Sequence, residues 1–181
     1  GAATGATSVA TVAWLGYDPP DGAVADPGEL GAILGDRRAR VGGRALTAAL
    51  DGLALRPRQR LTLVGHSYGS TTVGAALLEG ASADNVVVLG SPGVLVDHAD
   101  DFHRPDADFF ALAADDDPVA RLGWFGPNPA RRGSGFSRLA TDASGHSGYL
   151  RDGSLSQGKV AAAVLDQVAQ GPLDRRPHGG R

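Results

Sequence analysis

The feature that most constrains this chain is the pentapeptide Gly65–Gly69, Gly-His-Ser-Tyr-Gly. It follows an apolar run that begins at Leu61 and precedes a helix-like segment of small residues, 70–78. Strand, Gly-x-Ser-x-Gly and helix, in this order, are typical of a nucleophile elbow, a turn so tight that the residues two positions either side of the serine are expected to lack side chains. Such a turn projects Ser67 Oγ above the carboxyl edge of a sheet, at the amino end of a helix whose N–H groups favour an oxyanion. The alternative is a Gly-rich turn with an accidental serine, because a chain with 27 glycines produces such pentapeptides by chance.

Composition restricts the classes of function. At 181 residues, 42% hydrophobic and 20% charged, the chain has the size and composition of one globular domain. The net charge of −3 gives no electrostatic basis for a nucleic-acid or anionic-membrane partner, and no apolar run is long enough to span a membrane. Without cysteine there are no disulfides, no thiolate metal sites and no cysteine nucleophile. The chain begins at Gly1 rather than methionine, so we expect upstream residues to be missing; nothing resembles a signal peptide, and we favour the cytoplasm.

Strands alternate with helices along the chain, which predicts an α/β domain with a mainly parallel sheet over residues 1–170. The expected strands are the run that ends at Gly65 and the segments 9–15, 85–89, 108–114 and, as a short strand, 136–140. The expected helices are 37–55, with Val41, Leu46, Leu50 and Leu53 on one apolar stripe, 70–78, and 156–170, with Val160, Val164, Leu165 and Val168 on its apolar face. The Gly42-Gly43 pair interrupts the first of these helices, and the tail 171–181 is expected to be disordered.

A serine hydroxyl is a weak nucleophile until a base takes its proton, and the base works best when a carboxylate orients it. In proteins that use this elbow the chain order is serine, acid, histidine. His146 follows the last expected strand and precedes the last helix, where the base is expected; a surface histidine is the alternative. The other histidines lie inside the elbow, before the strand that ends in an Asp cluster, or in the tail: His66, His98, His103 and His178.

The best candidate for the acid is Asp117, which follows the strand 108–114 and precedes a proline that restricts its backbone to extended conformations. Asp115 and Asp116 are close alternatives, since three adjacent carboxylates are more often a solvated turn or a helix cap; Asp97 is a weaker one. The Asp- and His-rich loop 97–103 matches no metal-ligand spacing, so no metal is expected.

A long loop, 16–28, leaves the first expected strand at the carboxyl edge where a pocket forms. Tyr17 is therefore a candidate substrate contact, as is His66, which flanks the serine. A solvated surface loop is the alternative for Tyr17.

Six blocks of the sequence resemble, in order, an uncharacterised actinobacterial α/β-hydrolase family, the DUF1023 group. They are 12–18, 65–70, 89–93, 117–119, 125–129 and 146–150, and the resemblance extends over about residues 8–170. It implies the α/β-hydrolase fold and a triad of Ser67, Asp117 and His146. It implies no substrate.

The same resemblance implies a strand upstream of the first block, whose following loop donates the second oxyanion N–H; Tyr68 donates the first. If Val9–Leu15 is the fourth strand of that fold, the third is missing, and the chain is an N-terminally truncated domain with half an oxyanion hole. If Val9–Leu15 is the third strand, Gly16 or Tyr17 is the second donor.

The residues together favour a serine hydrolase that cleaves a carboxylic ester or a related small acyl substrate and needs no cofactor. Acyl transfer and peptide hydrolysis would use the same groups. A non-catalytic binding module and an inactive fragment are the alternatives. The sequence assigns no oligomeric state.

Overall fold

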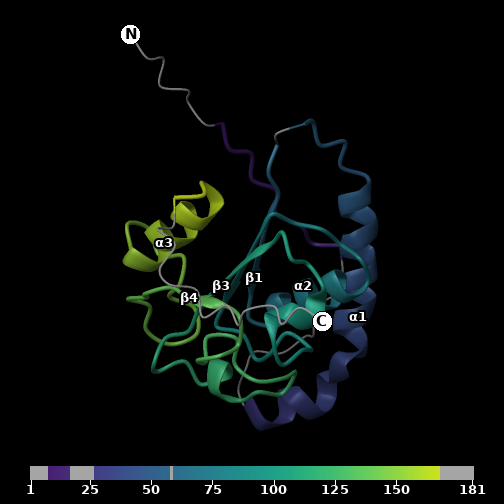
Figure 1. Cartoon of the computed structure of the whole chain (residues 1–181). Coiled ribbons are helices and arrows are strands. Elements are labelled where there is room, and N and C mark those ends of the chain that lie inside the picture. The colour runs from purple at the N-terminus through teal and green to yellow at the C-terminus, as the bar shows by residue number, and fades with distance from the viewer. Residues whose placement is uncertain (1–7, 17–26, 58, 168–181) are drawn as a thin grey trace, which may run out of the picture.

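The computed structural model describes residues 8–16, 27–57 and 59–167 (Figure 1). Four parallel strands form one sheet in the order β1-β2-β3-β4. The strands are β1 Thr62–His66, β2 Asn85–Leu89, β3 Asp108–Leu112 and β4 Ser137–Arg138. The helices are α1 Pro27–Asp51, α2 Tyr68–Leu78 and α3 Leu155–Val164, with two short 3₁₀ helices, η1 Ala99–Phe102 and η2 Val119–Arg121. The predicted α/β domain with a parallel sheet is confirmed.

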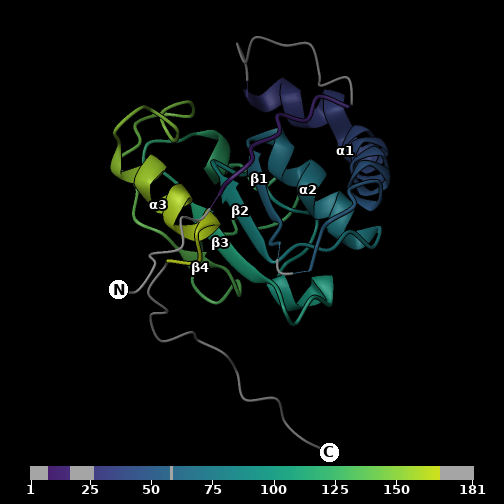
Figure 2. The same ribbon diagram turned by 90° about the horizontal axis from the view of Figure 1, so that it is seen from above.

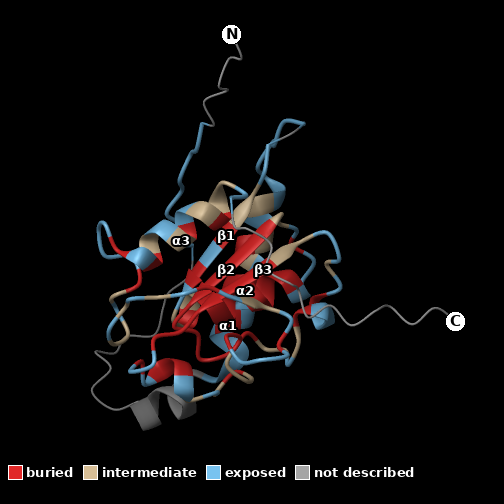
Figure 3. Ribbon diagram, turned by 60° about the vertical axis from the view of Figure 1, so that its left-hand side comes forward, coloured by how far each residue is buried: buried red, intermediate tan, exposed pale blue. Residues whose placement is uncertain are grey.

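The sheet lies between two helical layers, with α1 and α2 on one face and α3 on the other (Figure 2). Alternate residues of a strand point to opposite faces of the sheet. All five residues of β2 are buried, so this strand contributes side chains to the core on each face. Val86 and Val88 lie in the core beneath α2, whereas Val87 and Leu89 lie in the core beneath α3. Figure 3 shows these buried strands at the centre of the domain.

Helix α1 begins earlier than predicted, at Pro27, and has a kink at Gly35, where the backbone is not helical (φ 42°, ψ 172°). The predicted apolar stripe is wrong in part, because Val41 and Leu53 are exposed. The face that packs against α2 is formed instead by the small residues Ala39, Gly42 and Gly43 together with Leu46. The Gly42-Gly43 pair is therefore part of a close helix–helix contact rather than an interruption of the helix.

The prediction of a strand at Val9–Leu15 is wrong. Residues 8–16 form no strand, and Val9, Val12 and Leu15 are exposed. Only Trp14 of this segment packs against the core beneath α2. The segment is therefore neither the third nor the fourth strand of the sheet, and among the described residues β1 pairs with β2 alone.

The remaining elements differ from their predicted limits mainly in length. β3 ends at Leu112, β4 has two residues, and α3 ends at Val164. Within α3, Val160 and Ala163 are the buried apolar residues, and Val164 is only half-buried. Val168 and the tail 171–181 lie outside the described residues. In the part of the chain that the structure describes, no helix is both long and apolar enough to cross a membrane.

Candidate active site

The elbow is built as its sequence predicts on one side of the serine but not on the other. Ser67 separates β1 from α2 and has a positive backbone φ that residues with a side chain rarely adopt (φ 54°, ψ −132°). A Cβ on Gly65 would lie 2.7 Å from Ser70 Cα and 2.9 Å from the Gly69 carbonyl oxygen, so this glycine is sterically required. A Cβ on Gly69 would meet nothing within 4 Å, so the expectation that both glycines must lack side chains is wrong for Gly69.

The buried hydroxyl groups of Ser70 and Ser91 hold the elbow turn in place through hydrogen bonds. No role is predicted for these two serines from the sequence. Ser70 Oγ lies 2.6 Å from the Ser67 carbonyl oxygen and 2.7 Å from Ser91 Oγ. Ser91 follows β2 and accepts a hydrogen bond from the Gly93 N–H at 3.1 Å. The end of β2 is thus connected to the turn that carries Ser67. The only sequence signal for this contact is the Gly-Ser-Pro-Gly breaker after β2.

Three side chains that are far apart in the sequence lie in contact beside this turn. His146 Nε2 is 2.7 Å from Ser67 Oγ. On the other side of the ring, His146 Nδ1 is 3.0 Å from each carboxylate oxygen of Asp117. The serine comes from the β1–α2 turn, the aspartate from the segment after β3 and the histidine from the segment before α3.

Asp117 is completely buried, at 0% exposed. Burial raises the pKa of its carboxyl group, but hydrogen bonds from His146 and Tyr149, together with the backbone N–H of Ala120, more than compensate and hold the pKa below its ordinary value. Oδ1 also accepts from the Val119 N–H at 2.9 Å, which connects the carboxylate to the first residue of η2. Asp117 is therefore an ionised acceptor at neutral pH.

The alternative acids have other partners. Asp115 is 97% exposed and forms an ion pair with Arg138 at 3.3 Å. Asp116 accepts hydrogen bonds from Ser144 Oγ at 2.7 Å and from the Gly145 N–H at 2.9 Å, and these contacts lower the pKa of its carboxyl group. Asp97 contributes its backbone carbonyl to Arg131. Among the four candidates, Asp117 is the carboxylate that lies within hydrogen-bond distance of His146 Nδ1, at 3.0 Å.

The two candidate substrate contacts have different outcomes. His66 Nε2 donates a hydrogen bond of 2.7 Å to the backbone carbonyl of His146, and the two rings lie 4.7 Å apart. Desolvation of the ring lowers the pKa of His66, although the residue as a whole is exposed. His66 Nε2 therefore holds the backbone of the segment that carries His146. Tyr17 lies outside the described residues.

Tyr68 begins α2, so its N–H belongs to the first turn of a helix, where the dipole favours negative charge. Its side chain is buried in a small cluster with Ala39 and Phe125, whose ring it meets edge to face at 5.4 Å. The Tyr68 hydroxyl donates to the carbonyl of Gly35, at the kink of α1, at 3.3 Å. The side chain therefore packs the elbow against α1. Gly16, the alternative second donor, lies in the exposed segment 8–16, where a Cβ would meet the Trp14 ring rather than the elbow.

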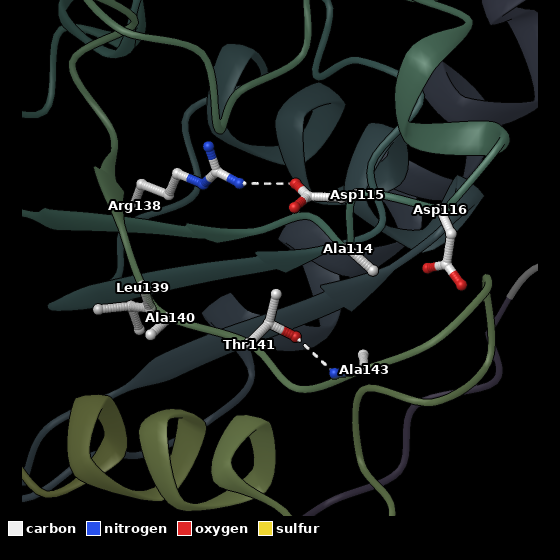
Figure 4. Close-up of a pocket in the computed structure, with 8 residues that line it drawn as sticks. All are labelled: Ala114, Asp115, Asp116, Arg138, Leu139, Ala140, Thr141 and Ala143. Atoms are coloured by element: carbon white, nitrogen blue, oxygen red, sulfur yellow. Dashed lines mark hydrogen bonds and ion pairs between the residues drawn. The ribbon is translucent and has the colours of Figure 1, made fainter.

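A hollow of about 400 Å³ lies beside these residues, at the carboxyl ends of β3 and β4 (Figure 4). Asp115, Asp116 and Arg138 provide its charged lining, and neither Ser67 nor His146 lines it. The hollow is therefore a neighbour of the Ser67 site and does not lie over the serine.

The Asp- and His-rich loop forms a local cap. His98 Nδ1 accepts from the Asp100 N–H, and Asp101 accepts from the His98 N–H, which closes a capping box around η1. In the described segments, no group of three or more His, Asp or Glu side chains is placed to hold a metal ion.

Tyr149 is a site residue to which sequence reasoning assigned no role. It lies three residues after His146, is 1% exposed, and donates a 2.6 Å hydrogen bond to Asp117 Oδ2. Its place in the 146–150 block is the only sequence signal for it.

Comparisons with known proteins agree with this architecture. The profile of the family described as Alpha/beta hydrolase matches residues 1–127, which include Ser67 and Asp117. The uncharacterized protein Rv2079 of Mycobacterium tuberculosis is 41% identical over 119 residues, 63% of this chain and 17% of that protein. The uncharacterized protein Mb0988c of Mycobacterium bovis is 36% identical over 129 residues, 67% of this chain and 46% of that protein.

The chain spans less than half the length of these curated relatives. No solved structure matches it significantly. The family match extends over more than two thirds of the sequence, and it includes the elbow and the segment that carries the buried carboxylate. The chain belongs to the alpha/beta hydrolase family, and this membership supports a hydrolase-type function.

Proposed function

We propose that this protein is a serine hydrolase that cleaves a carboxylic ester or a related small acyl compound through an acyl-enzyme. The observation that supports this most is the 2.7 Å contact between His146 Nε2 and Ser67 Oγ, with a buried carboxylate behind the histidine. A nucleophile, a base within hydrogen-bond reach and a third group that orients the base are the arrangement that activates a serine.

In the proposed reaction, Ser67 Oγ attacks the acyl carbon while His146 Nε2 takes the hydroxyl proton. The carbonyl oxygen becomes an oxyanion, which the Tyr68 N–H stabilises at the amino end of α2. His146 then gives the proton to the leaving alkoxide, and an acyl-Ser67 ester remains. Water, deprotonated by His146, attacks this ester and releases the acid, which restores the Ser67 hydroxyl.

The surroundings of Asp117 support its part in this scheme. Because its pKa is held below the ordinary value, the carboxylate is charged at neutral pH, where it fixes the Nδ1–H tautomer of His146 and stabilises the imidazolium that forms. The tautomer leaves Nε2 as an acceptor for the Ser67 proton. His66 and Tyr17 remain candidate substrate contacts within this proposal, His66 through the part of its ring that does not hold the His146 carbonyl.

The alternative of a non-catalytic binding module predicts no particular relation between Ser67 and His146. The contact between them therefore favours chemistry.

The test is labelling with a fluorophosphonate probe, combined with hydrolysis of p-nitrophenyl acetate. We expect one adduct, on Ser67, mapped by peptide mass spectrometry. Ser67→Ala should remove the adduct and lower ester turnover by at least about a thousandfold, because the residual rate then comes only from oxyanion stabilisation and substrate binding. His146→Ala should abolish labelling as well.

Ser82→Ala is the matched control, because Ser82 is an exposed serine away from the elbow and its loss should leave labelling unchanged. Circular dichroism of each variant checks that the fold is kept. Equal turnover by the wild type and Ser67→Ala, both folded, would reject the proposal. An adduct on another residue would also reject it.

A further inference from the structure

The Tyr149 hydroxyl occupies a central position behind the proposed triad. It donates to Asp117 Oδ2 at 2.6 Å and accepts the Ala114 N–H at 2.8 Å. Ala114 follows β3, so one oxygen atom connects the end of that strand to the carboxylate. Tyr149 is among the most completely buried large side chains of the described residues.

The two oxygens of Asp117 are held differently. Oδ1 accepts from the backbone N–H groups of Val119 and Ala120, at 2.9 and 3.3 Å. Among the described residues, Oδ2 accepts from the Tyr149 hydroxyl and shares the contact with His146 Nδ1, and no backbone N–H donates to it. The orientation of the carboxylate plane toward His146 therefore depends on Tyr149 at Oδ2 as much as on the η2 backbone at Oδ1.

Gly90 shows how closely these groups are packed. It follows β2 with φ +54°, and a Cβ there would lie 2.6 Å from Asp117 Oδ2, 2.8 Å from Tyr149 Cε2 and 3.2 Å from His146 Nδ1. The aspartate, the tyrosine and the histidine thus meet above one residue without a side chain. A displaced carboxylate would have little room in which to find another donor.

We propose that Tyr149 is a positioning residue of the active site, which holds the carboxylate of Asp117 in plane with His146 and stabilises its ionised form. The expected effect on the rate rests on the proposed hydrolase function, whereas the expected effect on the stability of the fold does not. Burial raises the pKa of the Tyr149 phenol, and the neighbouring carboxylate raises it further, so the hydroxyl stays a donor throughout the working range of pH.

The kinetic test is Tyr149→Phe, which removes one oxygen and keeps the ring. A hydrogen bond to a charged group contributes enough that we expect kcat for p-nitrophenyl acetate to fall about tenfold to a hundredfold, with KM changed less than about twofold. We also expect the acid limb of the pH profile to move to higher pH, because Asp117 without this donor holds a proton on the Asp117–His146 pair more strongly, so that the base is freed only at higher pH. A residue of purely structural importance would lower the rate without moving the limb.

The control is Ser134→Ala. The Ser134 hydroxyl is also buried, and it too donates one hydrogen bond, to the Pro129 carbonyl, and accepts one, from the Phe136 N–H. Its removal should destabilise the fold in a similar way but leave the pH profile and kcat unchanged.

A second measurement does not depend on activity. The loss of unfolding free energy caused by Tyr149→Phe should be largest at pH 7 and should shrink as the pH falls below about 4, because protonation of Asp117 removes the charge to which Tyr149 donates. The loss in Ser134→Ala should not change with pH. The other ionisable groups that face Asp117 are His146, His66 and Asp116, so the measurement is repeated in Asp117→Asn, where the pH dependence of the Tyr149→Phe effect should vanish.

These outcomes separate the two proposals. If the wild type neither reacts with the probe nor hydrolyses ester, the hydrolase proposal fails, and the stability measurement still decides the role of Tyr149. If the wild type is active and Tyr149→Phe keeps its kcat and its acid limb, the positioning role is overturned. A Tyr149→Phe stability loss that is the same at pH 7 and pH 3 overturns it also.

Discussion

At the scale of single residues, the two glycines of the elbow are not equivalent. Gly65 is the last residue but one of β1 and lies against the start of α2. Any side chain at this position would overlap with the backbone of Ser70. Gly69 is the second residue of α2, and its Cα faces open space. The spacing of the motif is symmetric, but the steric requirement is on the strand side, because that is where the two backbones approach.

Alanine at each position tests this difference. Gly65→Ala should lower the free energy of unfolding by about 1–3 kcal/mol, because the backbone must shift to admit the methyl group. Gly69→Ala should leave it unchanged or raise it by up to about 1 kcal/mol, since alanine favours a helix over glycine. Urea unfolding followed by circular dichroism measures both, and equal losses would contradict the asymmetry.

At the scale of elements, the segment that carries His146 is held to the end of β3 by Asp116. The two hydrogen bonds from Ser144 and Gly145 end within two residues of the base, and His66 holds the carbonyl of His146 from the side of the elbow. A base displaced by about 1 Å can lose a hundredfold in rate. We therefore expect the hydrogen bonds of Asp116 and His66 to affect the position of the His146 ring more than the stability of the fold.

Removing the Asp116 acceptor should be seen in the rate. We expect Asp116→Ala to slow fluorophosphonate labelling of Ser67 about tenfold to a hundredfold, because the 144–146 segment loses its two hydrogen bonds to the β3 end. Asp115→Ala, one residue earlier, removes only an exposed ion pair with Arg138 and should label at the wild-type rate. Similar rates for the two variants would show that Asp116 does not position the base.

At the scale of the whole molecule, several carboxylates are ionised more readily in the folded chain than in the unfolded one. Hydrogen bonds from the backbone and side chain of Ser156 lower the pKa of Asp142 to about 2, and these bonds hold the first turn of α3. The pKa values of Asp116 and Asp117 are lowered as well. A carboxyl group with a lowered pKa stabilises the fold above its unfolded pKa, and this contribution is lost as the pH falls through the folded value.

The free energy of unfolding should therefore decrease as the pH falls from about 4 toward about 2. Asp142→Asn removes one of the contributing carboxylates, so its curve against pH should be less steep than that of the wild type, and its stability at pH 7 should be lower. Urea unfolding at several pH values measures the two curves. Parallel curves would contradict the part assigned to Asp142.

Much of this arrangement could be predicted from local sequence. β2 was predicted with its observed bounds, because a short, fully apolar run between breakers has few alternatives once it is buried. The chain order of serine, acid and histidine directed attention to Ser67, Asp117 and His146, and these three side chains lie in contact. Both predictions depend on residues close together in the chain or on the fixed direction of parallel strands.

What only the tertiary structure decided depends on contacts between distant segments. The apolar composition of Val9–Leu15 favoured a strand, but a strand also needs a partner strand, and none of the strands in the described part of the chain pairs with this segment. The face of α1 that packs against α2 is made mainly of small residues. A search for a periodic stripe of large apolar residues does not detect such a face. The choice among three adjacent aspartates, and the contact of Tyr149 with one of them, followed from which side chain the end of β3 buries, and this is set by packing across the sheet rather than by spacing along the chain.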